Sequence, residues 1–255
     1  QMLPWFHYPS LIWFPLLCLS AQALAADWKT SEIDGRKYVA LEEIAKTYSL
    51  EPMEAREDPA EIGYRGENRS FLVKIDSRQA IINGIRHWFA FPALKNSEGT
   101  AHMSQLDART MLARAFDPAS VSGIGEVKTV VFDPGHGGSD PGARNRYGKE
   151  KYYTLDIVKR TRRILEERGI KVVQNRLKDF YVRLSSRPSM TKNYESPIFV
   201  SVHLNASGNL KASGFEIFSL TPVGAPPHGR SSSQKKDTEK HPGTTHEGAS
   251  YLMAN

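Results

Sequence analysis

The sequence predicts an α/β fold, in which a mostly parallel sheet flanked by helices follows a small α+β domain. From residue 129 onward, short apolar runs of the kind buried in parallel sheets alternate with helical patterns. Before residue 118, short strands separated by turn residues accompany only two helical patterns. Between these regions, residues 118–128 are mostly small and show no apolar repeat, which predicts a linker.

Residues 1–25 have the features of a secretory signal peptide. The stretch "LIWFPLLCLSAQALA" is apolar and ends in Ala23-Leu24-Ala25, an A-x-A cleavage pattern, although no Lys or Arg precedes it. Its apolar run is too short and too interrupted for a membrane span. The only cysteine, Cys18, lies in this segment, so the mature chain would contain no disulfide. We therefore expect a secreted protein of the periplasm or cell wall.

Residues 27–117 are expected to form the small α+β domain. A turn at Asp34-Gly35 leads into a short strand, and apolar spacing predicts a helix over Leu41–Tyr48. The Asn83-Gly84 pair predicts a hairpin turn between two further strands. A closing helix is predicted over Leu106–Phe116, and nothing in this region forms a catalytic constellation.

Residues 129–255 are expected to form the second domain. An amphipathic helix over Tyr153–Gly169 ends in a glycine, which is a common helix stop. Alternation of strands with helices favours parallel strand pairs. The strands are predicted at Thr129–Asp133, 170–175, Pro197–Asn205 and Gly214–Leu220, a short helix at 184–195, and an exposed loop at Thr221–Gly248.

The chain is basic, with a formal net charge of +6 at pH 7. A basic surface suits an anionic partner such as nucleic acid, a membrane surface or a polyanionic cell wall. Charge alone does not choose among these partners, and it agrees equally well with a soluble basic protein that has no such partner.

Three side chains with metal-binding chemistry fall at one edge of the predicted sheet. His136 follows the first strand of the second domain, and His203 ends the strand "PIFVSVH". Glu150 falls at the start of the first helix, which begins on the same side of the sheet. Ligands of open α/β sheets gather at the carboxyl ends of the strands. Two imidazoles and one carboxylate are a common catalytic zinc set that leaves a position open for water.

Each of these residues also has a structural interpretation. His203 would be an ordinary histidine at a strand end, and Glu150 a carboxylate favoured by the helix dipole. The glycines around His136 could instead cradle an anion, although the P-loop Lys-Ser pair and the spaced glycines of a dinucleotide turn are missing. The spacing alone is weak support for a metal.

Several blocks, in order, resemble the amidase 3 family of zinc-dependent N-acetylmuramoyl-L-alanine amidases. They are "VVFDPGHGGSDPGA", "GKEKYYTLDI", "FVSVHLNAS" and "GFEIFSL", together with Leu184 and Arg187 of an "L…R" segment. The resemblance covers Lys128 to about Leu220. It implies a catalytic domain over 129–255, with Zn²⁺ as cofactor and His136, Glu150 and His203 as its ligands.

The same resemblance implies hydrolysis of the amide between the lactyl group of muramic acid and L-alanine in bacterial peptidoglycan. The expected partner is therefore a muropeptide, with no nucleic acid and no membrane span after signal cleavage; a protein activator is left unspecified. The family also carries a second glutamate, near its C-terminal end, that acts as general base. The present chain ends at Asn255, before that segment, so we expect a C-terminally incomplete sheet and a poor catalyst. Glu216 and Glu247 do not match that glutamate, and the catalytic residue is left unassigned.

Two other classes of function stay open. One is a non-catalytic peptidoglycan-binding protein on an amidase scaffold, and the other is a different zinc peptidase. The run "AIINGIRHWF" makes residues 27–117 similar to the N-terminal module of copper amine oxidases, which implies a spacer or adaptor rather than copper chemistry. The remaining histidines after the signal peptide are expected to be structural or incidental: His87, His102, His228, His241 and His246.

Overall fold

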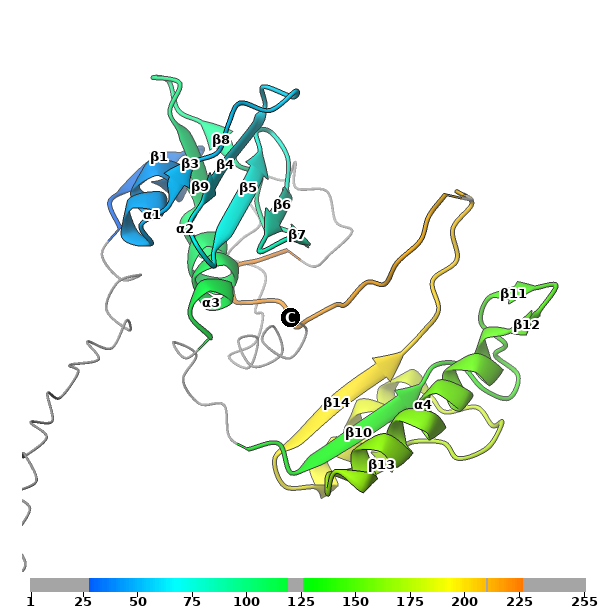
Figure 1. Cartoon of the computed structure of the whole chain (residues 1–255). Coiled ribbons are helices and arrows are strands. Elements are labelled where there is room, and N and C mark those ends of the chain that lie inside the picture. Colours follow the sequence, from blue (N-terminus) through cyan, green and yellow to red (C-terminus); the bar gives the residue numbers. More distant parts are fainter. Residues whose placement is uncertain (1–27, 119–125, 210, 227–255) are drawn as a thin grey trace, which may run out of the picture. The chain divides into compact units, whose positions relative to one another are not determined.

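The computed structural model describes residues 28–118, 126–209 and 211–226 (Figure 1). The predicted signal peptide and most of the predicted linker lie outside these residues. The described residues fall into two compact units: residues up to 118 group with 217–226, and residues 126–216 form the second unit. The domain boundaries expected from the sequence remain a prediction.

The first unit contains two antiparallel sheets. One has the order β1-β2-β9-β8, and the other is a meander of β3 to β7 in chain order. The Asp34-Gly35 and Asn83-Gly84 pairs form the hairpin turns between β1 and β2 and between β6 and β7, and all four residues have positive φ. The strands are β1 (Thr30–Ile33), β2 (Arg36–Ala40), β3 (Glu51–Pro52), β4 (Glu61–Arg65), β5 (Ser70–Lys74), β6 (Gln79–Ile82), β7 (Ile85–Trp88), β8 (Leu94–Lys95) and β9 (Ala101–Ser104).

Two helical stretches close the core of the first unit. The helix α1 covers Leu41–Thr47, and α2 (Gln105–Asp107) continues through a π-helical turn into α3 (Ala113–Phe116). The core packs side chains of both stretches, including Leu41, Leu112 and Phe116, against residues of both sheets. Both helices predicted from apolar spacing are therefore present, with ends that differ by one residue.

The second unit is built on a three-stranded sheet with the order β13-β10-β14. The central strand β10 (Thr129–Pro134) pairs in parallel with both β13 (Lys171–Gln174) and β14 (Pro197–Val202). The segment Thr129–Pro134 is buried along its whole length, which explains its unbroken apolar run. Figure 1 shows β10 and β14 side by side, with their carboxyl ends at the same edge.

The helix α4 (Glu150–Glu167) covers one face of this sheet. Val158 of α4 packs with Val130, Phe132 and Val172 of the strands, and this cluster is the core of the second unit. The helix begins three residues earlier than apolar spacing predicts, because Glu150 is held by backbone contacts rather than by an apolar side chain. A short hairpin of β11 (Arg144–Asn145) and β12 (Gly148–Lys149) precedes it.

Residues 184–195 form two 3₁₀-helices, Leu184–Ser186 and Pro188–Asn193, where one short helix was expected. The strand predicted at Gly214–Leu220 is wrong, since no residue of this segment joins a described sheet. Phe215 is 88% exposed there. An alternating apolar pattern becomes a strand only where a neighbouring backbone supplies its hydrogen bonds, and this segment has no such neighbour among the described residues.

The prediction of a mixed α/β fold is confirmed, whereas a mostly parallel fold is not. Parallel ladders occur in the second unit, and the other three described sheets are antiparallel. Strands joined by tight turns can pair only in the antiparallel sense, because a parallel pair needs a longer crossover. Among the described residues, no helix is both long and apolar enough to span a bilayer.

Candidate metal centre

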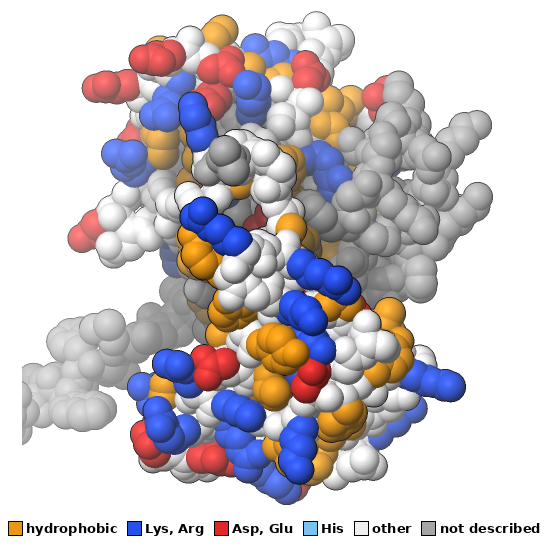
Figure 2. All heavy atoms as spheres, turned by 90° about the vertical axis from the view of Figure 1, so that its right-hand side faces the viewer, with side chains coloured by type: hydrophobic (Ala, Val, Ile, Leu, Met, Phe, Trp, Pro, Cys, Tyr) orange, Lys and Arg blue, Asp and Glu red, His pale blue; other side chains and the backbone are white. Residues whose placement is uncertain are grey.

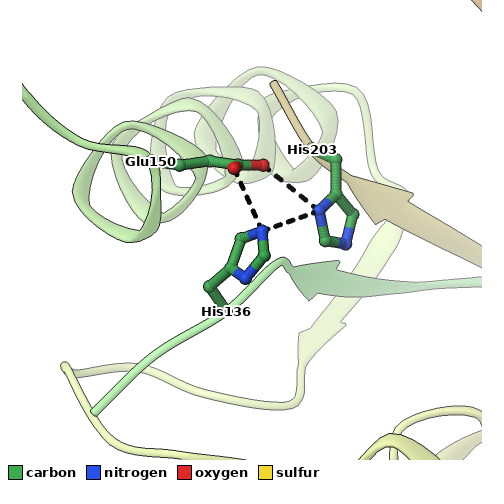
Figure 3. Close-up of side chains that lie close together, drawn as sticks. All are labelled: His136, Glu150 and His203. Atoms are coloured by element: carbon green, nitrogen blue, oxygen red, sulfur yellow. Dashed lines mark hydrogen bonds and ion pairs between the residues drawn. The ribbon is translucent and has the colours of Figure 1, made fainter. Parts of the chain in front are cut away.

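The structure brings His136, Glu150 and His203 together at the carboxyl edge of the parallel sheet (Figure 3). His136 lies two residues after β10, Glu150 is the first residue of α4, and His203 directly follows β14. One ligand atom from each residue lies within 4.8 Å of the others. Topology therefore unites side chains that are separated by 14 and 53 positions in the sequence.

The donor atoms of the three side chains lie at spacings suited to a small divalent cation. The Nε2 atom of His136 lies 3.0 Å from Oε2 of Glu150, and Nδ1 of His203 lies 3.2 Å from Oε1. The two ring nitrogens are 3.2 Å apart. Tetrahedral zinc, with bonds of about 2.0–2.1 Å, separates its ligand atoms by about 3.3 Å. The two histidines contact different oxygens of Glu150, and the donor set and its spacing are compatible with a zinc site that has three protein ligands.

Glu150 is the most buried of the three candidate ligands, with 5% of its side chain exposed. The backbone N–H groups of Ala143 and Leu204 donate to its two carboxylate oxygens at 2.9 and 2.8 Å. Burial by itself would raise the pKa of Glu150, but these two donors and the adjacent histidines outweigh it, so the pKa is lowered. The carboxylate is therefore ionised and its orientation is determined before any cation binds.

His136 is presented by a glycine-rich loop and has a left-handed backbone, with φ of 63°. Its Nδ1 atom lies 2.9 Å from Oδ2 of Asp140, so Nε2 points to Glu150. A Cβ atom on Gly142 would come within 2.4 Å of Cδ2 of His136 and 2.6 Å of Oε2 of Glu150. Only glycine fits at this position, because the backbone of residue 142 touches two of the three candidate ligands.

His203 rests against the backbone of Gly135. A Cβ atom on Gly135 would approach Cε1 of the His203 ring to 2.4 Å. The N–H of Gly135 donates to the carbonyl of Val202 at 2.9 Å, which ties this loop to the end of β14. Glycines near His136 therefore leave room for the side chains of His203 and Glu150, and this explains why the loop is rich in glycine.

A buried polar cluster at the carboxyl end of β10 holds the loop that carries His136. Asp133 and Arg187 form an ion pair at 2.7 Å, with both side chains at most 5% exposed. Arg187 also donates to the backbone carbonyl of His136 at 3.2 Å, and Ser201 donates to Asp133 at 2.8 Å. Leu184, the other residue of the "L…R" segment, is 76% exposed.

Asp140 is not among the candidate site residues predicted from the sequence. Its signal was a carboxylate four positions after a histidine inside a glycine-rich loop, a spacing that brings the two side chains together only because the loop turns sharply. The His136 side chain, as hydrogen-bond partner, is the main cause of the lowered pKa of Asp140. A carboxylate in this place determines which ring nitrogen carries the proton.

The other acidic and histidine candidates lie apart from the centre. His87 and His102 are buried in the first unit, where Nδ1 of His102 contacts the Thr100 carbonyl at 2.8 Å. Glu216 accepts a hydrogen bond from Asn205 and is not part of the cluster. The other candidates considered from the sequence lie outside the described residues: His228, His241, His246 and Glu247.

Comparison with known proteins relates this segment of the chain to a family of enzymes. Residues 130–249 match the amidase 3 family, described as N-acetylmuramoyl-L-alanine amidase. The matched range begins in β10 and contains all three residues of the centre.

Two curated relatives illustrate the extent of the amidase similarity. A sporulation-specific N-acetylmuramoyl-L-alanine amidase of Bacillus subtilis is 40% identical over 99 residues, which are 38% of each protein. The N-acetylmuramoyl-L-alanine amidase AmiA of Escherichia coli is 39% identical over 102 residues, or 40% of the present chain and 35% of AmiA. The chain thus spans little more than a third of the length of these relatives.

Solved structures of similar name also match over about a third of the chain. The amidase AmiC2 of Nostoc punctiforme is 42% identical to the present chain over the aligned residues, which are 34% of the present chain and 48% of the AmiC2 chain. The two structures superpose with a TM-score of 0.31. The catalytic domain of CwlV from Bacillus (Paenibacillus) polymyxa is 34% identical over 33% of the present chain and 49% of the CwlV chain, with a TM-score of 0.32.

Proposed function

We propose that the chain is a zinc hydrolase that cleaves the amide between N-acetylmuramoyl residues and L-alanine in bacterial peptidoglycan. One observation carries the proposal: His136, Glu150 and His203 converge inside the segment that matches the amidase family. The curated relatives are named for this activity.

Zinc, when bound, supplies Lewis acidity that polarises an amide carbonyl and makes water nucleophilic near neutral pH. The residues of the chain prepare the centre for this role. Asp140 holds the proton of His136 at Nδ1, which leaves the Nε2 lone pair free to act as a ligand. Glu150 contributes one negative charge, which partly offsets the charge of a divalent ion and leaves the centre electrophilic.

The centre is open on the side away from Glu150. The side chains of His136 and His203 are 21% and 46% exposed, whereas that of Glu150 is 5% exposed. A cross-linked polymer such as peptidoglycan cannot enter a deep pocket, so ligands that solvent reaches are compatible with it as substrate.

Proton transfer needs a group beyond the three proposed ligands, and we assign none. Asp140 already accepts from His136 and from the backbone N–H of Gly142 at 3.1 Å, so it is placed as a positioning residue. Among the described residues, the metal-type cluster holds no second carboxylate besides Glu150. A general acid–base carboxylate typically contributes about 10²–10⁴ in rate.

The surface and the N-terminal segment agree with a cell-wall location. Figure 2 shows lysine and arginine side chains spread over the visible face, with acidic side chains between them. Together with the net charge of +6, this suits an anionic glycan–peptide polymer. We propose secretion through residues 1–25 and a spacer or adaptor role for residues 27–117.

The deciding experiment is digestion of purified sacculi by the zinc-loaded chain, followed by mass spectrometry of the released peptides. We expect stem peptides with a free L-alanine amino group. Glu150→Gln should lose zinc and release nothing, whereas Glu166→Gln, an exposed change on the same helix, should behave as wild type. Cleavage between amino acids would instead identify a peptidase. Binding to sacculi without release would identify a non-catalytic module, and either result would refute the proposal.

A further inference from the structure

Arg176 is a fully buried arginine, with 1% of the residue exposed, in the loop that follows β13. Its hydrogen bonds go to backbone carbonyls and to one hydroxyl group rather than to a carboxylate. Burying a guanidinium is costly unless its donors are satisfied. Apart from the Lys178 carbonyl at 3.4 Å, these acceptors lie on the two elements that carry His136 and Glu150.

The first pair of bonds holds the loop that presents His136. Nε of Arg176 donates to the Pro134 carbonyl at 2.9 Å, and Nη2 donates to the Gly135 carbonyl at 2.9 Å. These are the last two residues before His136. Arg176 therefore holds the backbone at the end of β10, where the loop to His136 begins.

The same Nη2 atom also reaches the first turn of α4. It donates to the Lys151 carbonyl at 2.8 Å and to the Thr154 hydroxyl at 3.1 Å. Lys151 directly follows Glu150, and the Thr154 hydroxyl in turn donates to the Gly135 carbonyl at 2.9 Å. The loop of His136 and the helix of Glu150 are thus joined through one side chain.

The third ligand is reached through Gly135. Because a Cβ atom on Gly135 would lie 2.4 Å from the His203 ring, the peptide that Arg176 holds is also the surface against which that ring packs. The Gly135 N–H bonds to the Val202 carbonyl, so β14 is included in the same arrangement. A shift of the Gly135 peptide would displace both histidines at once.

We propose that Arg176 is a positioning residue that sets the distances among His136, Glu150 and His203, and thereby the affinity and coordination geometry of the bound metal. This inference rests on the proposed metal-dependent function. Arginine suits this role because its planar guanidinium directs donors from two separate nitrogens, Nε toward Pro134 and Nη2 toward Gly135 and α4, whereas lysine carries its three donors on one nitrogen and would keep only part of these bonds. Partners of this kind outside the ligand set typically change metal affinity by about 10–100-fold.

The test compares zinc affinity, by competition with a chromophoric chelator, and the visible spectrum of the Co²⁺-loaded full chain. Arg176→Met is expected to weaken zinc binding by about 10–100-fold and to alter the Co²⁺ bands. Arg176→Lys should be intermediate. The control is Val130→Ala, a buried change at the opposite end of β10, which should lower thermal stability but leave the affinity within about twofold and the Co²⁺ bands unchanged.

The outcomes separate this inference from the proposed function. Wild-type affinity and an unchanged Co²⁺ spectrum in folded Arg176→Met would overturn it. If the Met variant does not fold, Arg176→Lys decides, and a folded Lys variant with wild-type affinity would also overturn it. A Lys variant that fails to fold would assign Arg176 to stability alone and would refute the positioning role. Wild-type protein that binds no zinc would refute the proposed function itself.

Discussion

The Nδ1 atom of His136 lies 2.9 Å from Oδ2 of Asp140, four residues further along the same glycine-rich loop. This contact fixes the ring so that Nε2 faces Glu150 at 3.0 Å. Asp140 also accepts the Gly142 N–H, so its own position is determined by the loop. A carboxylate held in this way both orients a histidine ligand and makes it a better electron donor.

The first prediction concerns this carboxylate. Asp140→Ala should weaken zinc binding by about 10–100-fold, because the His136 ring would lose both its orientation and the acceptor for its Nδ1 proton. The affinity is measured by chelator competition. Asp156→Ala removes an exposed carboxylate that also pairs at i,i+4, with Arg160, and serves as the control. Equal affinity in the two variants would show that Asp140 has no influence on the centre.

The second prediction concerns the ligands themselves. His136→Ala and His203→Ala should each abolish stoichiometric zinc binding, because two remaining ligands form an incomplete site. Metal analysis after dialysis against trace zinc measures this directly. Full retention of zinc by both variants would refute the assignment.

The third prediction separates steric blockage from backbone strain. Gly142 and Gly169 both have positive φ, of 64° and 79°, but only Gly142 touches the centre. Gly142→Ala should lose zinc, since its Cβ would overlap His136 and Glu150. Gly169→Ala meets nothing within 4 Å and should cost only about 1 kcal/mol of stability. Zinc content and thermal unfolding are measured for both, and a Gly142→Ala protein with full zinc would contradict the proposed packing.

The fourth prediction concerns Asp107, a buried residue of the first unit. Its carboxylate accepts the N–H groups of Ala90 and Phe91 and lies beside the Ser104 hydroxyl. Burial raises its pKa from 3.8 to about 6, in spite of these donors. The folded state therefore binds this proton more tightly than the unfolded state. Its contribution to stability is largest below pH 4 and is lost as the pH rises through about 6, by about 3 kcal/mol.

The measurement compares wild type with Asp107→Asn, because the buried His87, whose pKa is lowered by burial, titrates in the opposite sense. In a chain without residues 1–25, both tryptophans, Trp28 and Trp88, belong to the first unit, so their fluorescence follows its unfolding. The difference in unfolding free energy between the two proteins should shrink from pH 4 to pH 7. A difference that is constant or grows with pH would contradict the raised pKa.

Local pattern was sufficient for most of the elements. The apolar runs of β10 and β14 and the turns at Asp34-Gly35 and Asn83-Gly84 depend on side chains close together in the chain, so the sequence predicts them directly. Apolar spacing starts α4 three residues late, because Glu150 is held by contacts from Ala143 and from Leu204, 54 positions away.

Residue types and element order establish which chemistry can occur, since two imidazoles and a carboxylate fall at one sheet edge in a glycine-rich setting. Which groups hold these side chains depends on contacts between distant segments. Arg176 acts on residues 22 to 42 positions away, and Asp133 on Arg187 at a separation of 54. The strand expected at Gly214–Leu220 is likewise absent because no described backbone pairs with it. Periodicity reports which face of an element is apolar, whereas hydrogen-bond partners depend on how distant segments meet.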